Sequence, residues 1–332
     1  MKRRKKPFII LAVILVVVLL VAGYIKFFNG SLIYFTTGMK SGELIKTAGQ
    51  KITYTCEADI LMSDVKKEYE EMFGSDIWKE KIGDADFESY IKDQIKSKLM
   101  RVKAMNVKAK ERGVVLGREE KDSVSKAVDA FYNELTESQI SSTGITKDKL
   151  NTMFTEFAVA QKLYDDITSS MDIEVSADEA RVIDIQYIVS DSEEEINKAY
   201  NLVNSGSSFF AVAKEYNADG EYEYELKRDE MDEAFEKAAF NLSTGGMSRI
   251  VEAAGRYYII RCTSDNDKAK TEVNKSAILE KRKLEQFNAD FEKYEAGIYM
   301  EFNNSEWKKL SIQDAYTLES SFEDTFNAYF GK

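Results

Sequence analysis

The side chains that most often carry catalysis are scarce in this chain. Its 332 residues include no histidine and only two cysteines, Cys56 and Cys262. The lack of histidine excludes Ser-His-Asp and Cys-His nucleophile pairs, and also zinc sites or facial triads that need histidine. Two cysteines are too few for a four-cysteine metal site. We therefore expect no metal and no cofactor.

The two cysteines lie far apart in the sequence, at positions 56 and 262. An oxidising compartment would allow them to pair, but the sequence does not tell whether their Cα atoms come within bonding range. We favour two separate buried thiols over a disulfide. No motif around either cysteine indicates a reactive thiol.

Other residues have a spacing that suits binding. Met231 and Phe235 lie four positions apart in a segment with helical periodicity, so they share one helix face. Tyr187 and Tyr258 lie in segments with the composition of strands, and their neutral phenols can donate hydrogen bonds. On spacing alone, packing in a core explains both sets as well.

The charge balance argues against nucleic acid as a partner. There are 58 acidic and 46 basic side chains, a net charge of −12, whereas a nucleic-acid binder needs a basic face that displaces counterions. Six of the basic side chains lie in residues 1–26, which leaves 40 basic against 58 acidic, or −18, in the rest of the chain. Anionic lipid headgroups repel such a surface.

The N-terminus predicts a membrane anchor. Residues 2–6 are all basic, and Phe8–Ile25 is a run of 18 residues without a charge. At about 1.5 Å per residue, this run just crosses a bilayer core of about 30 Å. Because the basic cluster lies on one side only, we expect a single-pass protein of the cell membrane, with a cytoplasmic N-terminus and an extracytoplasmic bulk. The alternative is a cleaved signal peptide, although Val21-Ala22-Gly23 is a weak cleavage site.

Helical patterns dominate the chain after the first 58 residues. Apolar residues recur with helical spacing over 86–112, just before the stop signal of Gly113. Further helices are predicted over 118–136 and, with Thr146 as the N-cap, over 146–169.

Near residue 175 the pattern changes to alternating strands and short helices. In chain order these are the strand Arg181–Ser190, helices at 192–204 and from 207, an extended stretch at 222–227, a helix at 229–240, and a hairpin of 248–253 with 256–262. This β-α-α-β-α-β-β order predicts a module around a small antiparallel sheet. Beyond it, helices are predicted over 268–296 and 312–330.

The module at 179–264 resembles the parvulin rotamase domain. The similarity lies in the strand IQYIV, the segment SSFFAVAKEYN, the helix MDEAFEKAAFNL and the turn and strand TGGMSRIVEAAGRYYIIRC. Outside the module, the stretches AKERGVVLGREE, GITKDKLNTMFTEFAVAQKLY and FNNSEWKKL resemble the helical chaperone region of SurA- and PrsA-type foldases. With its anchor, the layout is most similar to PpiD-type or anchored PrsA-type proteins.

The resemblance implies a proline-binding site whose polar part is altered. Tyr187 and Tyr258 stand where the family has two histidines, and they are our candidate catalytic residues. Met231 and Phe235 keep the apolar proline pocket and, with Tyr222, are the candidate substrate-binding residues.

The position that is acidic or a thiol in the family is ambiguous here. It aligns with Tyr222, or with Asp219 if a gap is placed there. Whether the chain is an active peptidyl-prolyl cis-trans isomerase is therefore left open.

The predicted fold class is α+β, with a discontinuous helical chaperone domain that carries an inserted parvulin-like domain. The predicted segments are a cytoplasmic basic tail (1–7), a transmembrane signal anchor (8–25), a stalk with a short strand at Lys51–Cys56 (26–58), the N-terminal part of the helical domain (59–178), the parvulin-like domain (179–266) and the C-terminal part of the helical domain (267–332).

The favoured function is a membrane-anchored extracytoplasmic foldase that binds unfolded or newly secreted polypeptides, with weak or lost isomerase activity. One alternative is an active isomerase with a histidine-free site, and another is a docking protein at the secretion or cell-wall machinery. A homodimer is left open. Two aromatic groups are candidate client surfaces, although core packing is favoured for each: Met72, Phe73 and Trp78, and Phe322, Phe326, Tyr329 and Phe330.

Overall fold

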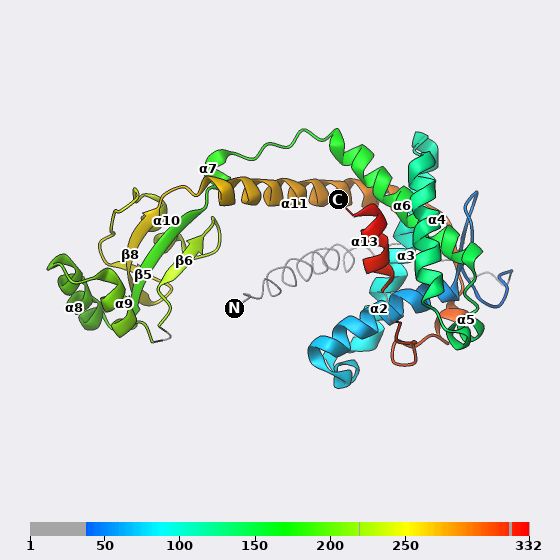
Figure 1. The fold of residues 1–332 in the computed structure, drawn as a ribbon, viewed down its shortest axis with the longest axis horizontal. Helices are drawn as coiled ribbons and strands as arrows, with labels where there is room; N and C mark the ends of the chain where they lie inside the picture. The colour runs from blue at the N-terminus through cyan, green and yellow to red at the C-terminus, as the bar shows by residue number, and fades with distance from the viewer. Residues whose placement is uncertain (1–37, 219, 319–320, 332) are drawn as a thin grey trace. The chain divides into compact units, whose positions relative to one another are not determined.

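The computed structural model describes residues 38–218, 220–318 and 321–331. The chain forms two compact units (Figure 1). The first contains the described residues up to Ser170 together with those from Phe287 onward, and the second is Met171–Gln286. No helix in the described ranges has both the length and the apolar character needed to cross a membrane. The predicted basic tail and the anchor at 8–25 lie outside these ranges.

The first unit is mainly helical, and local sequence sets the ends of its helices. Asp86 caps α3 (Phe87–Arg112) by accepting a hydrogen bond from the Ser89 amide at 2.8 Å, and Gly113 ends the helix at a φ of 73°. Thr146 caps α6 (Lys147–Ser169) in the same way, so both predicted helices are confirmed. The other helices are α2 (Thr55–Phe73), η1 (Ser75–Lys79), α4 (Arg118–Asn133), α5 (Glu137–Thr143), α12 (Asn304–Trp307) and α13 (Phe322–Phe330).

The C-terminal helix α13 completes the core of the first unit. Phe322 is 2% exposed, and its ring centroid lies 4.6 Å from that of Phe154 and 4.9 Å from that of Phe157, both on α6. Burying a phenylalanine contributes about 1.5–3 kcal/mol to stability. The segments before and after the second unit are thus joined in one apolar core.

A small sheet adds a second link between the same segments. β1 (Glu43–Thr47) pairs antiparallel with β2 (Thr53–Tyr54) on one side and with β9 (Met300–Phe302) on the other. Neither β1 nor β9 was predicted as a strand from the sequence. A separate hairpin joins β3 (Lys81–Ile82) to β4 (Ala85–Asp86).

Three predicted elements of the first unit are corrected by the structure. The strand over Lys51–Cys56 is confined to β2, because the Glu57 side chain accepts a hydrogen bond from the Tyr54 amide and α2 begins at Thr55. The helix over 118–136 ends at Asn133, because Thr136 caps α5. The helix over 312–330 is limited to α13, since the preceding described residues through 318 are non-helical and bury Ile312 and Leu318.

The second unit has the predicted order of elements. α7 (Ala177–Ala180) precedes β5 (Ile183–Ser190), α8 (Glu193–Asn204), α9 (Phe209–Tyr216), β6 (Glu223–Leu226), α10 (Glu233–Phe240), β7 (Val251–Ala253) and β8 (Arg256–Ser264). The strands form an antiparallel sheet in the order β6-β5-β8-β7. Helix α11 (Lys268–Glu295) begins in this unit and ends in the first.

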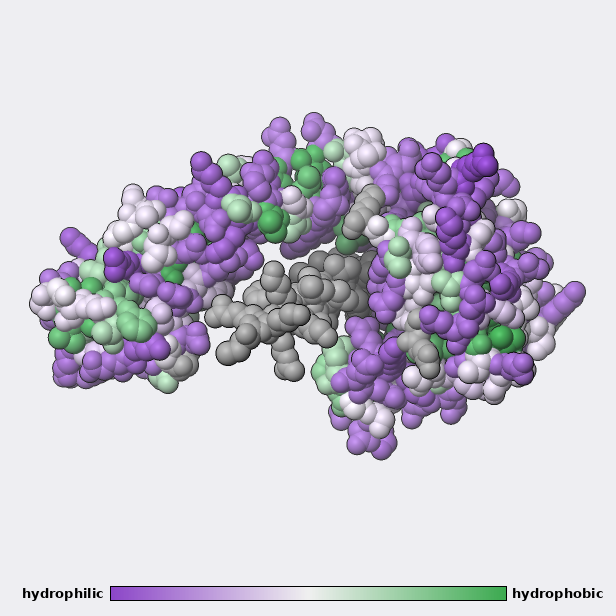
Figure 2. All heavy atoms as spheres, in the orientation of Figure 1, coloured by the Kyte–Doolittle hydropathy of each residue, from purple (hydrophilic) through white to green (hydrophobic). Residues whose placement is uncertain are grey.

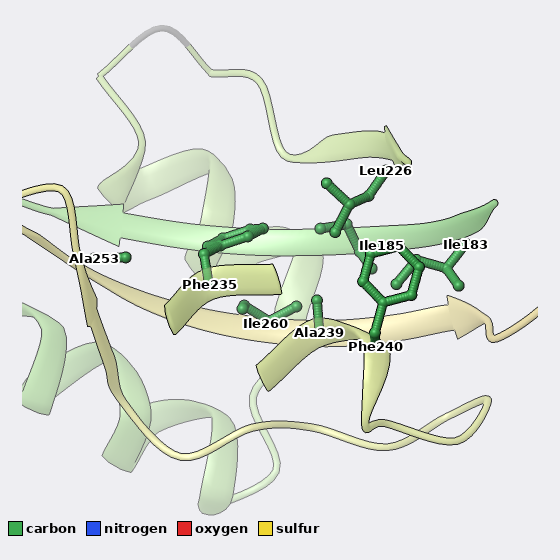
Figure 3. Close-up of a cluster of buried hydrophobic side chains, with 8 residues drawn as sticks. All are labelled: Ile183, Ile185, Leu226, Phe235, Ala239, Phe240, Ala253 and Ile260. Carbon is green, nitrogen blue, oxygen red and sulfur yellow. The ribbon is translucent and has the colours of Figure 1, made fainter. Parts of the chain in front are cut away.

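An apolar cluster covers each face of this sheet. On one face, α10 contributes Phe235, Ala239 and Phe240, which pack against strand residues such as Ile185 and Ile260 (Figure 3). On the other face, α8 and α9 pack around other residues of β5 and β8. Since successive strand residues point to opposite faces, the register of the strands decides which cluster each side chain joins.

The surface is largely polar. Hydrophilic residues cover most of the face drawn in Figure 2, and hydrophobic residues appear there in small separate patches. In the described ranges, the most exposed of the large hydrophobic side chains are Val273, Val115 and Phe73, at 72%, 68% and 58%. Single exposed apolar residues are normal, so only those with a structural context point to a binding site.

Candidate functional site

The structure brings two of the predicted site residues into direct contact. Phe235 lies on α10 and is 2% exposed, while Tyr258 lies on β8 and is half-buried against the same cluster (Figure 3 shows Phe235). Their ring centroids are 5.0 Å apart and the ring planes meet at 80°, an edge-to-face arrangement. Such a pair contributes about 0.5–1.5 kcal/mol beyond its buried area. The contact holds the partly buried Tyr258 ring against the edge of the cluster.

Tyr187 reaches the same face of the sheet. It pairs with Ile260 across β5 and β8, while Tyr258 pairs with Val189. The two tyrosines are therefore diagonal neighbours, for which Cα atoms are about 7–8 Å apart. The main chain of Tyr187 is held firmly, because its amide donates to the Tyr222 carbonyl at 2.9 Å and its carbonyl accepts from Asn217 Nδ2 at 3.0 Å.

Met231 lies before α10 rather than on it, contrary to the predicted helix over 229–240. The chain passes Asp229 at a φ of 64° before the helix begins at Glu233. The buried carboxylate of Glu236 accepts hydrogen bonds from the amides of Glu230 and Met231, at 2.8 and 2.9 Å. The loop is thus held in place while the Met231 side chain stays 39% exposed, where it can meet a ligand.

Tyr222 is not brought to this face. It packs against the cluster on the opposite face, and its ring lies 5.0 Å from that of the exposed Phe210. The main-chain carbonyl of Tyr222 accepts the hydrogen bond from the Tyr187 amide. Its alternative, Asp219, lies outside the described residues.

Two further residues on this face of the sheet were not predicted from the sequence. Arg256 donates to Asp191 at 2.6 Å; this bond foremost, with a smaller contribution from the nearby Tyr258, raises its pKa further. Tyr224 packs on the cluster from β6, and its pKa is raised by burial first and then by the nearby Glu230 carboxylate. Strand alternation could have found Arg256, because residues two apart on β8 share a face.

The arrangement can bind and orient but offers no nucleophile. An edge-to-face aromatic pair can pack against an apolar ring, and the exposed thioether of Met231, on the loop before α10, can do the same. A guanidinium close to a phenol polarises the hydroxyl and makes it a better hydrogen-bond donor. Cys262, also in this unit, is a buried free thiol whose pKa burial raises. Cys56 is buried and free as well, which confirms the favoured pair of separate thiols.

The predicted client surfaces of the first unit are partly core. Trp78 is 3% exposed and its indole N–H donates to Glu70 at 2.8 Å, whereas Phe73 next to it is 58% exposed. In the second group, Phe322 and Phe326 are buried and Tyr329 is exposed. Phe73 and Tyr329, with the half-buried Met72 and Phe330, are therefore the members that a client could reach.

Comparison with known proteins gives the second unit a family. Residues 188–264 match the family model described as Rotamase, the PPIC-type PPIase domain. The chain is 26% identical over 245 residues to the foldase protein PrsA of Caldanaerobacter subterraneus, covering 67% of this chain and 73% of that one. It is 37% identical over 98 residues to the foldase protein PrsA of Bacillus subtilis, which is 27% of this chain and 32% of that one.

Among solved structures, the chain is similar to the peptidylprolyl isomerase PrsA of Bacillus cereus. The identity is 18%, the match covers 87% of this chain and 99% of that one, and the TM-score is 0.38.

Proposed function

We propose that this chain, a PrsA-type foldase with a PPIC-type parvulin domain, is anchored in the membrane and holds unfolded secreted polypeptides. We propose further that its isomerase activity is weak or absent. The observation that carries the proposal is the Phe235–Tyr258 pair, which keeps an apolar site in a chain that has no histidine.

The reaction explains why such a site can bind well and turn over slowly. Rotation about a peptide bond meets a barrier of about 18–20 kcal/mol, and exchange of an X-Pro bond takes tens to hundreds of seconds. Catalysis requires that the twisted amide be bound more tightly than either planar form. Apolar contacts to the proline ring are similar in both states, so the exposed Met231 supports affinity, while the buried Phe235 holds the Tyr258 ring in place. Preference for the twisted state must come from directed hydrogen bonds.

Refolding of a model protein limited by proline isomerisation tests the proposal. The chain's only proline is Pro7, so its own folding adds almost no proline-limited background. We expect substoichiometric amounts to leave the refolding rate nearly unchanged and stoichiometric amounts to slow refolding by binding. A rate that rises linearly at substoichiometric amounts would refute the weak-activity part. No effect at any ratio, for several unrelated clients, would point to a docking protein instead.

One observation favours the alternative of an active, histidine-free isomerase. The Arg256 guanidinium lies near the Tyr258 phenol, and its positive charge favours hydrogen-bond donation by that hydroxyl, close to the apolar pair. If this donor stabilises the twisted amide, Tyr258→Phe should lower kcat and leave KM nearly unchanged, since the ring contact with Phe235 is retained. Equal losses of binding and turnover would indicate that the hydroxyl only supports the pocket.

The membrane location is also a proposal, and it is supported by the uncharged run at 8–25 after five basic residues. The full-length chain should stay with membranes in alkaline extraction, and externally added protease should degrade its bulk in spheroplasts. Release into the supernatant with a shortened N-terminus would show a cleaved signal peptide instead.

A further inference from the structure

The edge strand β6 has main-chain groups that none of the other strands in the described ranges uses. β6 lies at one end of the sheet order and pairs only with β5 (Figure 1). The Tyr187 amide donates to the Tyr222 carbonyl at 2.9 Å, which makes that couple a hydrogen-bonded pair. Since such pairs alternate along an antiparallel ladder, Tyr224 and Leu226 direct their main chain to β5. Glu223 and Glu225 direct theirs to the open edge.

These outward groups have no main-chain partner in the part of the chain that the structure describes. The neighbouring part of β5 is closed differently, because the Asn217 side chain accepts from the Val189 amide at 2.9 Å and donates to the Tyr187 carbonyl at 3.0 Å. The Asn217 side chain thus covers β5 beyond its pairing with β6, and the open edge is limited to β6 itself. An exposed strand edge is a template for one more strand.

A shallow groove lies beside this edge within the second unit. It has a volume of about 310 Å³ and is lined by Glu225 of β6, by Lys227 directly after β6, and by Ala269, Lys270, Val273, Asn274 and Ala277 of α11. Val273 is 72% exposed and, with Ala269 and Ala277, forms the apolar part of the groove wall. The groove thus pairs an apolar wall with an open main chain.

The charge on this side of the sheet selects the occupant. The side chains of Glu223 and Glu225 point to the face opposite Leu226, because alternate strand residues change sides. The nearby Lys270 is already surrounded by three carboxylates, those of Asp184, Glu225 and Asp267, at 2.6, 3.1 and 3.5 Å. With Lys227 counted as well, the four carboxylates of Asp184, Glu223, Glu225 and Asp267 outnumber the two ammonium groups. This excess favours a basic side chain with an aliphatic stem that can lie on Val273.

We propose that β6 captures an extended client segment in which lysine or arginine alternates with apolar residues, adding it as an antiparallel fifth strand. The basic residues lie opposite Glu223 and Glu225, exchange main-chain hydrogen bonds with them and place their stems in the groove. The apolar residues point to the Leu226 face. This mode of recognition reads the main chain and needs no proline, so it goes beyond the proposed function.

The geometry makes a sharp prediction for peptide main-chain modification. A fluorescent, proline-free peptide of alternating lysine and valine is titrated with the full-length chain and followed by anisotropy. Methylation of the lysine amides should weaken binding roughly tenfold or more, the effect of losing one or two hydrogen bonds at the edge. Methylation of the valine amides, which point away from β6, should change affinity little. Equal effects of the two modifications, or no binding of the unmodified peptide, would overturn the proposal.

A pair of proline variants tests the location of the strand. Glu225→Pro removes an outward amide without breaking a bond between β5 and β6. Glu252→Pro is the matched control on the opposite edge of the sheet. Glu252 lies between the hydrogen-bonded pairs Val251–Tyr258 and Ala253–Arg256, so its main-chain amide also points away from the neighbouring strand. Glu225→Pro should weaken binding roughly tenfold, and Glu252→Pro should not. Equal binding to both variants would refute the assignment to β6.

The two proposals can fail independently. The same preparations are assayed in proline-limited refolding, which reports the Phe235–Tyr258 site. Loss of peptide binding in Glu225→Pro with unchanged effect on refolding supports a separate site on β6. Absence of peptide binding in the parent chain, with its effect on refolding intact, rejects the strand-capture site alone.

Discussion

A buried ion pair in the first unit allows one stability prediction to be worked out in full. Lys103 on α3 is 1% exposed, and its ammonium lies 2.6 Å from both carboxylate oxygens of Glu156 on α6. It also donates to the Lys51 carbonyl at 2.8 Å. Asn106 ties the same helices together by donating to the carbonyl of Glu156 at 2.8 Å. One ammonium thus joins three segments of the core.

Replacing Lys103 by methionine should leave Glu156 buried without its counter-charge. Breaking such a pair costs about 3–5 kcal/mol, a large part of the roughly 5–15 kcal/mol that stabilises a domain. Replacing both partners by apolar residues of similar size is often neutral or stabilising. Lys103→Met with Glu156→Leu should therefore recover most of the loss. A half-exposed pair in the same unit, Lys162–Glu120 at 2.5 Å, is the control, and Lys162→Met should cost about 0–1 kcal/mol.

The predicted loss also has a pH dependence with a definite sign. Burial raises the pKa of Glu156 and Lys103 opposes that shift, so removing Lys103 raises it further. A folded-state pKa above the unfolded value contributes stability that is present at low pH and lost as the pH rises. The destabilisation of Lys103→Met should therefore be small at acidic pH and grow towards neutral pH.

Urea unfolding followed by tryptophan fluorescence measures this effect in the correct unit. The chain has two tryptophans, Trp78 and Trp307, and both are buried in the first unit. The signal therefore reports that unit without interference from the other. The reasoning is refuted if Lys103→Met costs no more than Lys162→Met, or if the double variant is no more stable than Lys103→Met.

Three further predictions concern particular sites. Burial raises the pKa of Glu57 from 4.5 to about 8, so the folded state retains a proton between these pH values and loses stability as the pH rises through them. In urea unfolding, the stability of Glu57→Gln relative to the parent chain should therefore increase across that pH range. Phe322→Ala should destabilise the first unit by about 3–5 kcal/mol, measured by the same fluorescence, whereas the exposed Tyr329→Ala should cost far less. Gly255 has a φ of 75°, so Gly255→Ala should cost the second unit roughly 1–2 kcal/mol and speed amide hydrogen exchange in β8, and unchanged exchange would contradict the strained turn.

The parts of the fold that were predicted well depend on signals within a few residues. Asp86, Gly113 and Thr146 mark helix ends because a capping side chain or a left-handed glycine satisfies main-chain groups next to it. The hairpin at Ala254-Gly255 is similar, since a two-residue turn with positive φ at both positions fixes the register of β7 and β8. The elements missed were short strands such as β1 and β9, whose strand pairing depends on each other and on β2, far away in the sequence.

The candidate site was predictable only in part, for the same reason. Alternation along β5 and β8 is enough to place Tyr187 and Tyr258 on one face once the two strands are known to pair. The separation of Tyr222 from them depends on which cluster its ring joins, and the position of Met231 depends on a carboxylate that holds the loop before α10.

The sequence by itself determined the chemistry that is excluded, the order of elements in the second unit and the apolar positions of its strands. A missing histidine cannot be supplied by folding, and turn and cap signals act locally. Only the tertiary structure decided that Glu156 neutralises Lys103, that Phe322 seals the core of α6, and that the edge of β6 stays open. Each of these depends on segments that meet through packing, where shape and burial rather than neighbouring residues select the partner.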